Sequence, residues 1–182
     1  MILKRSNLYK IYFIILIAQV IVSGGCSLFY KPPELFLGEN GEELTLESFA
    51  RGIRGEVLYP LSSTAKINSP FGKRWANFHE GIDLKADLGA PILSSISGKV
   101  VFSGVYGSYG KMLVIRRGNL LTVYAHCSKL LVIKGAFVRR GEKIAEVGKT
   151  GRASGYHLHF EIRLLNKSGR FVAVDPELFL PS

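Results

Sequence analysis

The sequence predicts a mainly β fold, an antiparallel sheet sandwich or small barrel. Twenty glycines are spread along the 182 residues. Apolar runs of roughly four to eight residues, the length of a strand, recur with little helical periodicity. Turn-forming stretches separate these runs at intervals of about 8–12 residues, which is typical of a sandwich. With 47% apolar and 21% charged residues, the chain has the composition of a globular protein.

The expected strands lie beyond Val57 and are bounded by turn sequences such as DLGAP, SYGK, RGN and RRGEK. A strand-like alternation also begins at Ile82 and continues through Leu84 and Ala86. In chain order the other strand candidates are residues 92–97, 98–104, 112–116, 120–126, 138–139, 143–147 and 158–164.

Residues 1–25 are predicted to be a lipoprotein-type signal peptide. Three cations and no acid precede a largely apolar run at 11–22, which is shorter than the about 20 residues of a membrane span. The following SGGC resembles the lipidation motif of bacterial export signals, with Cys26 as the lipidated residue. Ser23 stands where such motifs usually have leucine, so a plain anchor helix or an ordinary cleaved signal stays open.

The second cysteine, Cys127, lies between apolar neighbours in TVYAHCSKL. We expect it to be a small buried hydrophobe rather than a nucleophile or a metal ligand. A disulfide between Cys26 and Cys127 is the alternative in an oxidising compartment.

Residues 26–56 are predicted to be a tether with little structure, and residues 57–182 the folded domain. The tether contains Pro-Pro and GENG, with one short helix candidate around residues 44–51. Its GEELTLESFA resembles the first half of a wall-binding LysM module but is too short to form one.

The net positive charge favours an anionic partner. The formal net charge is +10, and it falls to +7 when the three cations of the signal are removed. Such a surface suits a membrane or an anionic polymer, and bacterial cell wall is one. No nucleic-acid-binding motif appears, so we expect no nucleic-acid partner.

Two of the four histidines lie one residue apart in SGYHLHFEIR. In a strand, His157 and His159 point to the same face with Cα atoms about 6.6 Å apart, while Leu158 and Phe160 face the core. Paired imidazoles on one strand face favour a metal or catalytic site.

A third histidine, His79, lies in NFHEGIDL, four residues before Asp83. Gly81 disfavours a helix here, and a fully extended chain would hold the two side chains about 13 Å apart, too far to share a metal. A bend at Glu80 and Gly81 brings them together, and glycine suits such a bend. The fourth histidine, His126, ends the apolar run LTVYAHCSKL.

Over residues 57–180 the chain resembles the M23 family of zinc metallopeptidases, the lysostaphin and LytM type. The resemblance is carried, in order, by SPFGKRWANFHEGIDLKADLGAPI, GKVVFSGVYGSYGKMLVIRRG and LLTVYAHCSKLLVIKGAFVRRGEKIAEVGKTGRASGYHLHFEIR. It implies that His79, Asp83 and His159 bind one zinc ion. It also implies that His126 and His157 stand near a metal-activated water and transfer protons.

The resemblance implies an endopeptidase that cuts peptide cross-links of peptidoglycan. Family members without a complete ligand set serve as activators of other wall hydrolases, and this alternative stays open. A biotinyl or lipoyl carrier is disfavoured, since GAFVRRGEKIAEV lacks the exposed lysine-bearing turn of a carrier.

We expect a monomer that is held by its lipid on the outer face of the cytoplasmic membrane. If the cell has two membranes, Ser27 after Cys26 favours the outer membrane, facing the periplasm.

Overall fold

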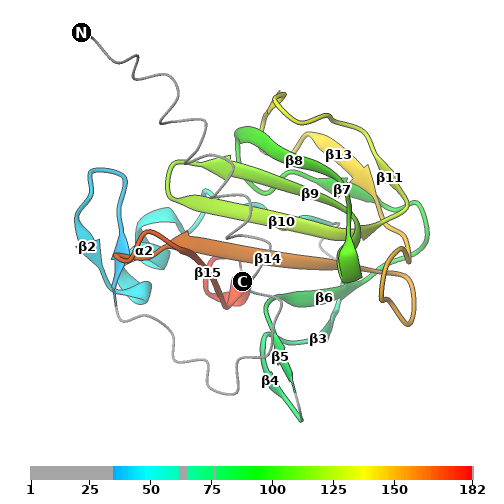
Figure 1. The fold of residues 1–182 in the computed structure, drawn as a ribbon, viewed down its shortest axis with the longest axis horizontal. Helices are drawn as coiled ribbons and strands as arrows, with labels where there is room; N and C mark the ends of the chain where they lie inside the picture. Colours follow the sequence, from blue (N-terminus) through cyan, green and yellow to red (C-terminus); the bar gives the residue numbers. More distant parts are fainter. Residues whose placement is uncertain (1–34, 62–64, 76, 182) are drawn as a thin grey trace, which may run out of the picture.

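The computed structural model describes residues 35–61, 65–75 and 77–181. These residues form mainly antiparallel β-structure, as predicted, around one large sheet (Figure 1). Its strands lie in the order β12-β8-β9-β10-β14-β6-β3, and β15 also pairs with β14. The strands of this sheet are β3 (Ile67–Ser69), β6 (Ile82–Lys85), β8 (Gly98–Tyr106), β9 (Gly110–Arg117), β10 (Leu120–Cys127), β12 (Phe137–Val138), β14 (His157–Leu165) and β15 (Phe171–Val174).

Three smaller pieces accompany the large sheet. A three-stranded sheet has the order β11-β13-β7, and the hairpin β4-β5 projects beside β6 and β3 (Figure 1). The hairpin β1-β2 and helix α2 lie near the start of the described chain. The remaining elements are β1 (Phe36–Leu37), β2 (Glu43–Leu44), α2 (Leu46–Ile53), β4 (Gly72–Arg74), β5 (Asn77–His79), β7 (Pro91–Leu93), β11 (Lys129–Leu130), β13 (Lys143–Glu146), η1 (Gly107–Tyr109) and η2 (Pro176–Leu178).

Most strand predictions agree with the structure to within a few residues, but the prediction for residues 92–97 was wrong in its second half. Strand β7 ends at Leu93. The next two backbone amides leave the ladder, since Ser94 donates to the carbonyl of Glu142 and Ser95 donates to the hydroxyl of Tyr124. Their alternative partners stop the strand where two serines follow Leu93.

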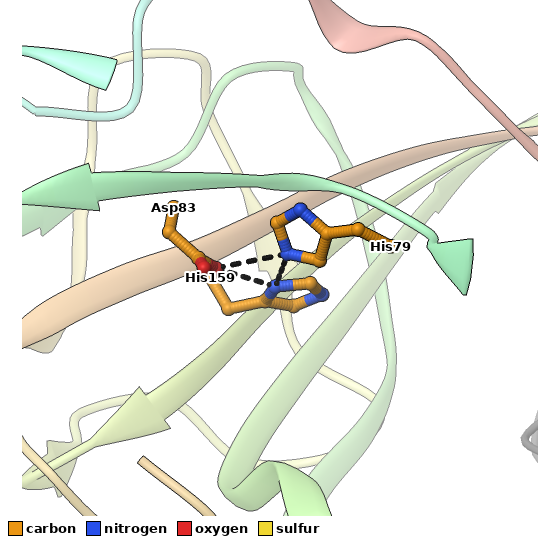
Figure 2. Close-up of side chains that lie close together, drawn as sticks. All are labelled: His79, Asp83 and His159. Atoms are coloured by element: carbon orange, nitrogen blue, oxygen red, sulfur yellow. Dashed lines mark hydrogen bonds and ion pairs between the residues drawn. The ribbon is translucent and has the colours of Figure 1, made fainter. Parts of the chain in front are cut away.

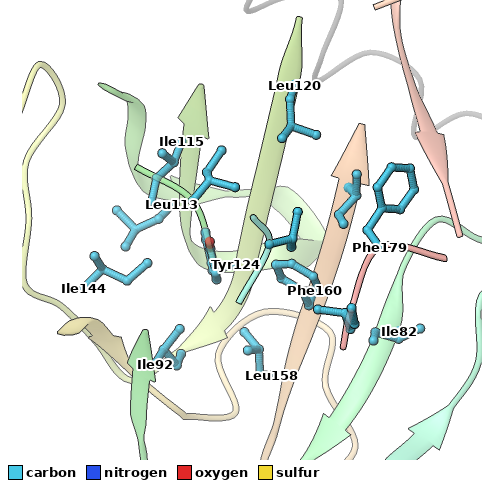
Figure 3. Close-up of a cluster of buried hydrophobic side chains, with 14 of the residues drawn as sticks. Ile82, Ile92, Leu113, Ile115, Leu120, Tyr124, Ile144, Leu158, Phe160 and Phe179 are labelled. Carbon is cyan, nitrogen blue, oxygen red and sulfur yellow. The ribbon is translucent and has the colours of Figure 1, made fainter. Parts of the chain in front are cut away.

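The main core lies between the large sheet and the three-stranded sheet, which gives the predicted sandwich. Figure 3 shows Leu113 and Tyr124 of the large sheet facing Ile92 and Ile144 of the smaller one. All four side chains are fully buried. Because burying one such side chain stabilises a fold by roughly 1.5–3 kcal/mol, this layer fixes how the sheets are stacked.

The described part of the predicted tether contributes to this core. Phe36 of β1 and Phe49 of α2 are buried in the same cluster as the sheet residues. Helix α2 begins after Thr45, whose side chain accepts a hydrogen bond from the backbone N–H of Ser48 at 3.2 Å. The packed unit thus begins before Val57.

The predicted signal peptide, residues 1–25, and Cys26 lie outside the described residues. Within 35–61, 65–75 and 77–181, none of the helices has the length and apolar character needed to cross a membrane.

The opposite face of the large sheet carries a second, smaller apolar cluster around Val114, Val123 and Ala125. The partly buried side chains of Tyr106 and Tyr109 pack against it. The four histidines lie close together on this side of the large sheet, where His159 pairs with Ala125.

Candidate metal centre

Strand β14 places His159 opposite Asp83. The two residues are direct partners in the antiparallel pairing of β14 with β6, and His159 also pairs with Ala125 of β10. The intervening Leu158 and Phe160 are fully buried in the main core. This confirms the alternation that the sequence predicts for the HLHF stretch.

His79 reaches the same place through a bend. Strand β5 ends at His79 and β6 begins at Ile82, so the chain turns at Glu80 and Gly81, as predicted. A Cβ atom on Gly81 would clash with the backbone oxygen of Phe160 and lie 2.9 Å from Cγ of Glu161. Only glycine lets the bend pass this close to β14.

The donor atoms of His79, Asp83 and His159 converge (Figure 2). His79 Nε2 lies 3.1 Å from both Asp83 Oδ1 and His159 Nδ1, and His159 Nδ1 lies 2.9 Å from Asp83 Oδ1. Tetrahedral zinc with bonds of about 2.0–2.1 Å would separate such donors by about 3.3 Å. The triangle is slightly smaller than that, and its two nitrogens and one oxygen fit a zinc ion.

The outer nitrogens of both ligand histidines have acceptors. His79 Nδ1 lies 2.7 Å from the carbonyl oxygen of Pro70, and His159 Nε2 lies 2.9 Å from Oε1 of Glu161. Because a carboxylate can only accept, Nε2 of His159 donates to Glu161, whereas Nδ1 of His79 lies between the Pro70 carbonyl, which accepts, and Nη2 of Arg74 at 2.9 Å, which only donates. The inner nitrogens, Nε2 of His79 and Nδ1 of His159, face the shared point and would give their lone pairs to a bound metal ion.

His126 reaches the site through a backbone irregularity. It is the one non-glycine residue with positive φ, at 61°, among those the structure describes. The pairing of β10 with β9 shifts register here, so Tyr124 and Cys127 both lie in the main core while Ala125 lies on the other face. The extra residue turns the His126 ring toward the site, within 4.8 Å of the His157 ring and 5.8 Å of the His159 ring between centroids.

His126 and His157 lie beside the donor triangle but do not belong to it. His126 Nδ1 lies 2.8 Å from the Thr150 carbonyl oxygen, and His157 Nδ1 lies 3.0 Å from the Gly155 carbonyl oxygen. Both rings therefore carry the proton on Nδ1 and leave Nε2 as an acceptor. His157 Nε2 is 3.7 Å from Asp83 Oδ1, longer than any contact within the triangle.

Burial and hydrogen bonding set the protonation states of Asp83 and His126. Burial alone would raise the pKa of Asp83, but hydrogen bonds from His159 and His79 hold that pKa well below its ordinary value. The pKa of His126 falls to about 4, chiefly because its ring is buried. Asp83 is thus an ionised ligand, and His126 is a neutral base at neutral pH.

Several residues of this centre were not predicted from the sequence. The Thr150 carbonyl orients His126, and Arg74 Nη2 donates to Asp83 Oδ2 at 3.1 Å, leaving Oδ1 for the metal. Glu161 and Arg163 extend the polar face of β14. The alternation of HLHFEIR could have placed these last two beside the histidines, since they follow at every second position.

Cys127 is the buried hydrophobe that the sequence predicts. Burial raises the pKa of its thiol to about 12, and the described residues include no disulfide partner for it. It packs in the main core, away from the metal ligands.

Comparison with known proteins identifies the family. Residues 77–176, more than half of the chain, match peptidase family M23. The chain belongs to this family. Its members are zinc metallopeptidases, and the described donors His79, Asp83 and His159 form a group that can hold the predicted ion.

Three relatives are similar over most of this chain. The chain is 43% identical to the DD-carboxypeptidase/endopeptidase Mpg of Neisseria meningitidis over 68% of its length, which is 31% of that protein. It is 37% identical to the uncharacterized lipoprotein YgeR of Escherichia coli, covering 70% of this chain and 49% of YgeR. A zinc-containing peptidase from Vibrio cholerae superposes with a TM-score of 0.60 at 34% identity, covering 76% of this chain and 44% of that one. The chain thus spans less than half of each relative.

Proposed function

We propose that this protein is a zinc-dependent endopeptidase that hydrolyses the peptide cross-links of bacterial peptidoglycan. One observation carries the proposal: three convergent ligand atoms stand next to two imidazoles that are held at Nδ1 by backbone carbonyls. Three protein ligands with an open fourth position are typical of catalytic rather than structural zinc.

His79, Asp83 and His159 would hold the ion through Nε2, Oδ1 and Nδ1. A zinc ion bound there supplies Lewis-acid polarisation of an amide carbonyl and lowers the pKa of a water molecule. His126 and His157, held by the carbonyls of Thr150 and Gly155, are each able to accept a proton at Nε2.

Once protonated at Nε2, either imidazole becomes a donor. It can then stabilise the developing oxyanion or return the proton to the leaving amine. The low pKa of His126 favours rapid return of a proton that this ring accepts.

Amide cross-links between D-amino acids in diaminopimelate-type wall are the proposed substrate, and pentaglycine bridges are the alternative. Zinc chemistry suits an amide, whereas glycosidases use a pair of carboxylates flanking the bond. The names of Mpg and of other relatives, such as the peptidoglycan DD-endopeptidase ShyB of Vibrio cholerae, support a D,D-specific peptidase.

The test is digestion of purified peptidoglycan of defined cross-link chemistry, followed by mass spectrometry of the released fragments. We expect cross-linked dimers to become monomers in the presence of zinc, and the activity to be lost with a chelator and restored by zinc. New reducing sugar ends with intact peptides would contradict an endopeptidase. Zinc binding without any cleavage would favour the non-enzymatic activator of other hydrolases.

We further propose that residues 1–25 are a cleaved signal and that a lipid on Cys26 holds a monomeric enzyme at the cell envelope. The similarity to the lipoprotein YgeR supports the anchor. Cys26→Ala should release a folded, active protein from membranes, because the lipid supplies the attachment. Unchanged membrane partition of this variant would contradict the anchor.

A further inference from the structure

A buried polar cluster continues from the metal centre along β14. Glu161 and Arg163 follow His159 at alternate positions on the same strand face. Glu161 is fully buried and Arg163 is 2% exposed. Burying charged groups is costly unless they are paired, so this arrangement calls for a reason beyond packing.

Both oxygens of the Glu161 carboxylate are engaged. Oε2 accepts from Nε of Arg163 at 2.6 Å, and Oε1 accepts from the Tyr109 hydroxyl at 2.8 Å. Arg163 is held in turn, since its Nη2 donates to Oε2 of Glu80 at 2.7 Å and to the Tyr109 oxygen at 3.2 Å. Glu80 belongs to the bend that carries His79 to the metal, so the cluster ties that bend to β14.

Donor and acceptor roles in this cluster place a proton on Nε2 of His159. Arginine only donates, so Oε2 of Glu161 accepts. The Tyr109 oxygen accepts a hydrogen bond from Arg163, and its own hydroxyl donates to Oε1 of Glu161 at 2.8 Å, which is nearer than Oε2 of Glu80 at 3.4 Å. A carboxylate with these partners remains an acceptor, and Nε2 of His159, 2.9 Å away, must donate to it. Nδ1, which lies 2.9 Å from Oδ1 of Asp83, is then the nitrogen that would give its lone pair to a bound metal ion.

We propose that Glu161, locked by Arg163 and Tyr109, is a positioning residue that fixes the tautomer of His159 and so sets the zinc affinity of the centre. The inference rests on the proposed zinc function. A carboxylate behind a ligand histidine raises the basicity of the ligand, and losing such a partner typically costs about 10–100-fold in metal affinity.

Glu161→Gln is the diagnostic substitution because it preserves shape and removes one acceptor. If the amide oxygen faces His159, the amide NH₂ meets Nε–H of Arg163, and two donors face each other. If the amide turns over, its NH₂ faces His159 and favours the tautomer with the proton on Nδ1, which does not bind metal. Either orientation weakens the centre.

The experiment measures the zinc dissociation constant by competition with a chromogenic chelator, together with thermal unfolding. We expect Glu161→Gln to bind zinc about 10–100-fold more weakly than the wild type. Tyr109→Phe removes one donor without changing the shape of the ring, and its loss should be smaller. The matched control is Glu146→Gln at the surface pair of Glu146 with Lys143, which should bind zinc like the wild type.

A second readout separates positioning from a merely structural role. In zinc-free protein, at a pH that keeps the ring neutral, ¹⁵N NMR shifts of His159 should report the Nε2–H tautomer in the wild type and a mixture of tautomers in Glu161→Gln. If the variant is folded and keeps both the affinity and the tautomer of the wild type, the inference is wrong. If it does not fold, Tyr109→Phe decides, and unchanged affinity and tautomer in that variant would overturn the inference.

Failure of the proposed function gives a different result. A wild type that binds no zinc contradicts the zinc enzyme itself. A wild type that binds zinc but leaves peptidoglycan intact, while Glu161→Gln loses affinity, contradicts the endopeptidase and supports the positioning role.

Discussion

The two faces of strand β14 are stabilised by different physics. The inward face carries Leu158, Phe160, Ile162 and Leu164, all fully buried. The outward face carries, at alternate positions, the side chains of His157, His159, Glu161 and Arg163. Apolar burial has no direction, so the inward face depends on volume. The outward face depends on which atom donates and which accepts, so a change of one atom can alter it.

The largest loss of stability should come from the inward face. Phe160 is fully buried, and its ring packs 5.4 Å from that of Tyr124 between centroids. We expect Phe160→Ala to lower the free energy of unfolding by about 3–5 kcal/mol, measured by urea denaturation. Zinc bound per folded chain should stay near one. As the control, Phe160→Leu should lower the free energy of unfolding less than Phe160→Ala. Loss of zinc with little loss of stability in Phe160→Ala would contradict the distinction between the two faces.

A substitution that disturbs both faces is Gly81→Ala. The new methyl group meets the backbone of Phe160, so β14 or the bend must shift. We expect a loss of about 1–3 kcal/mol together with weaker zinc binding, since the bend positions His79 and Asp83. Gly52→Ala in α2 is the control, because its methyl group enters open space. Wild-type zinc affinity in Gly81→Ala would refute this account of the bend.

A smaller effect tests the backbone of His126. With φ at 61°, an alanine is strained where a glycine is not. His126→Gly should therefore be more stable than His126→Ala by about 1 kcal/mol in thermal or urea unfolding. At Val123, an ordinary strand position, the order should reverse, with alanine the more stable replacement. The same order at both positions would contradict the irregularity in β10.

The smallest effect concerns the thiol on the core side of that irregularity. Since burial raises the pKa of Cys127 to about 12, its thiol stays protonated at pH 8 and is sterically covered. We expect no alkylation by iodoacetamide at pH 8 until the protein is unfolded, followed by mass spectrometry. Rapid modification of the folded protein would place Cys127 outside the core.

Local rules predicted much of this centre. Alternation along HLHF assigned both faces of β14, and the glycine in HEGID predicted the bend, because each depends only on neighbours in the chain. The strands β3, β4 and β11 have two or three residues, too few for alternation to reveal them.

Other features depend on contacts distant in sequence. His126 is oriented by a carbonyl 24 residues away, and Glu161 is held by a tyrosine 52 residues away. Strict alternation would have turned His126 toward the core beside Tyr124. Phe36 joins the core from a two-residue strand close to Pro32 and Pro33, which gives no periodic signal.

The division of the histidines by role is the central claim, and zinc content tests it most directly. Zinc per chain should fall well below one in His159→Ala, as in His79→Ala and Asp83→Ala, because each removes a ligand. His157→Ala and His126→Ala should keep zinc near one per chain while peptidoglycan cleavage slows by about 10²–10⁴-fold. If His157→Ala lost its zinc while His159→Ala retained it, the ligand assignment would be wrong.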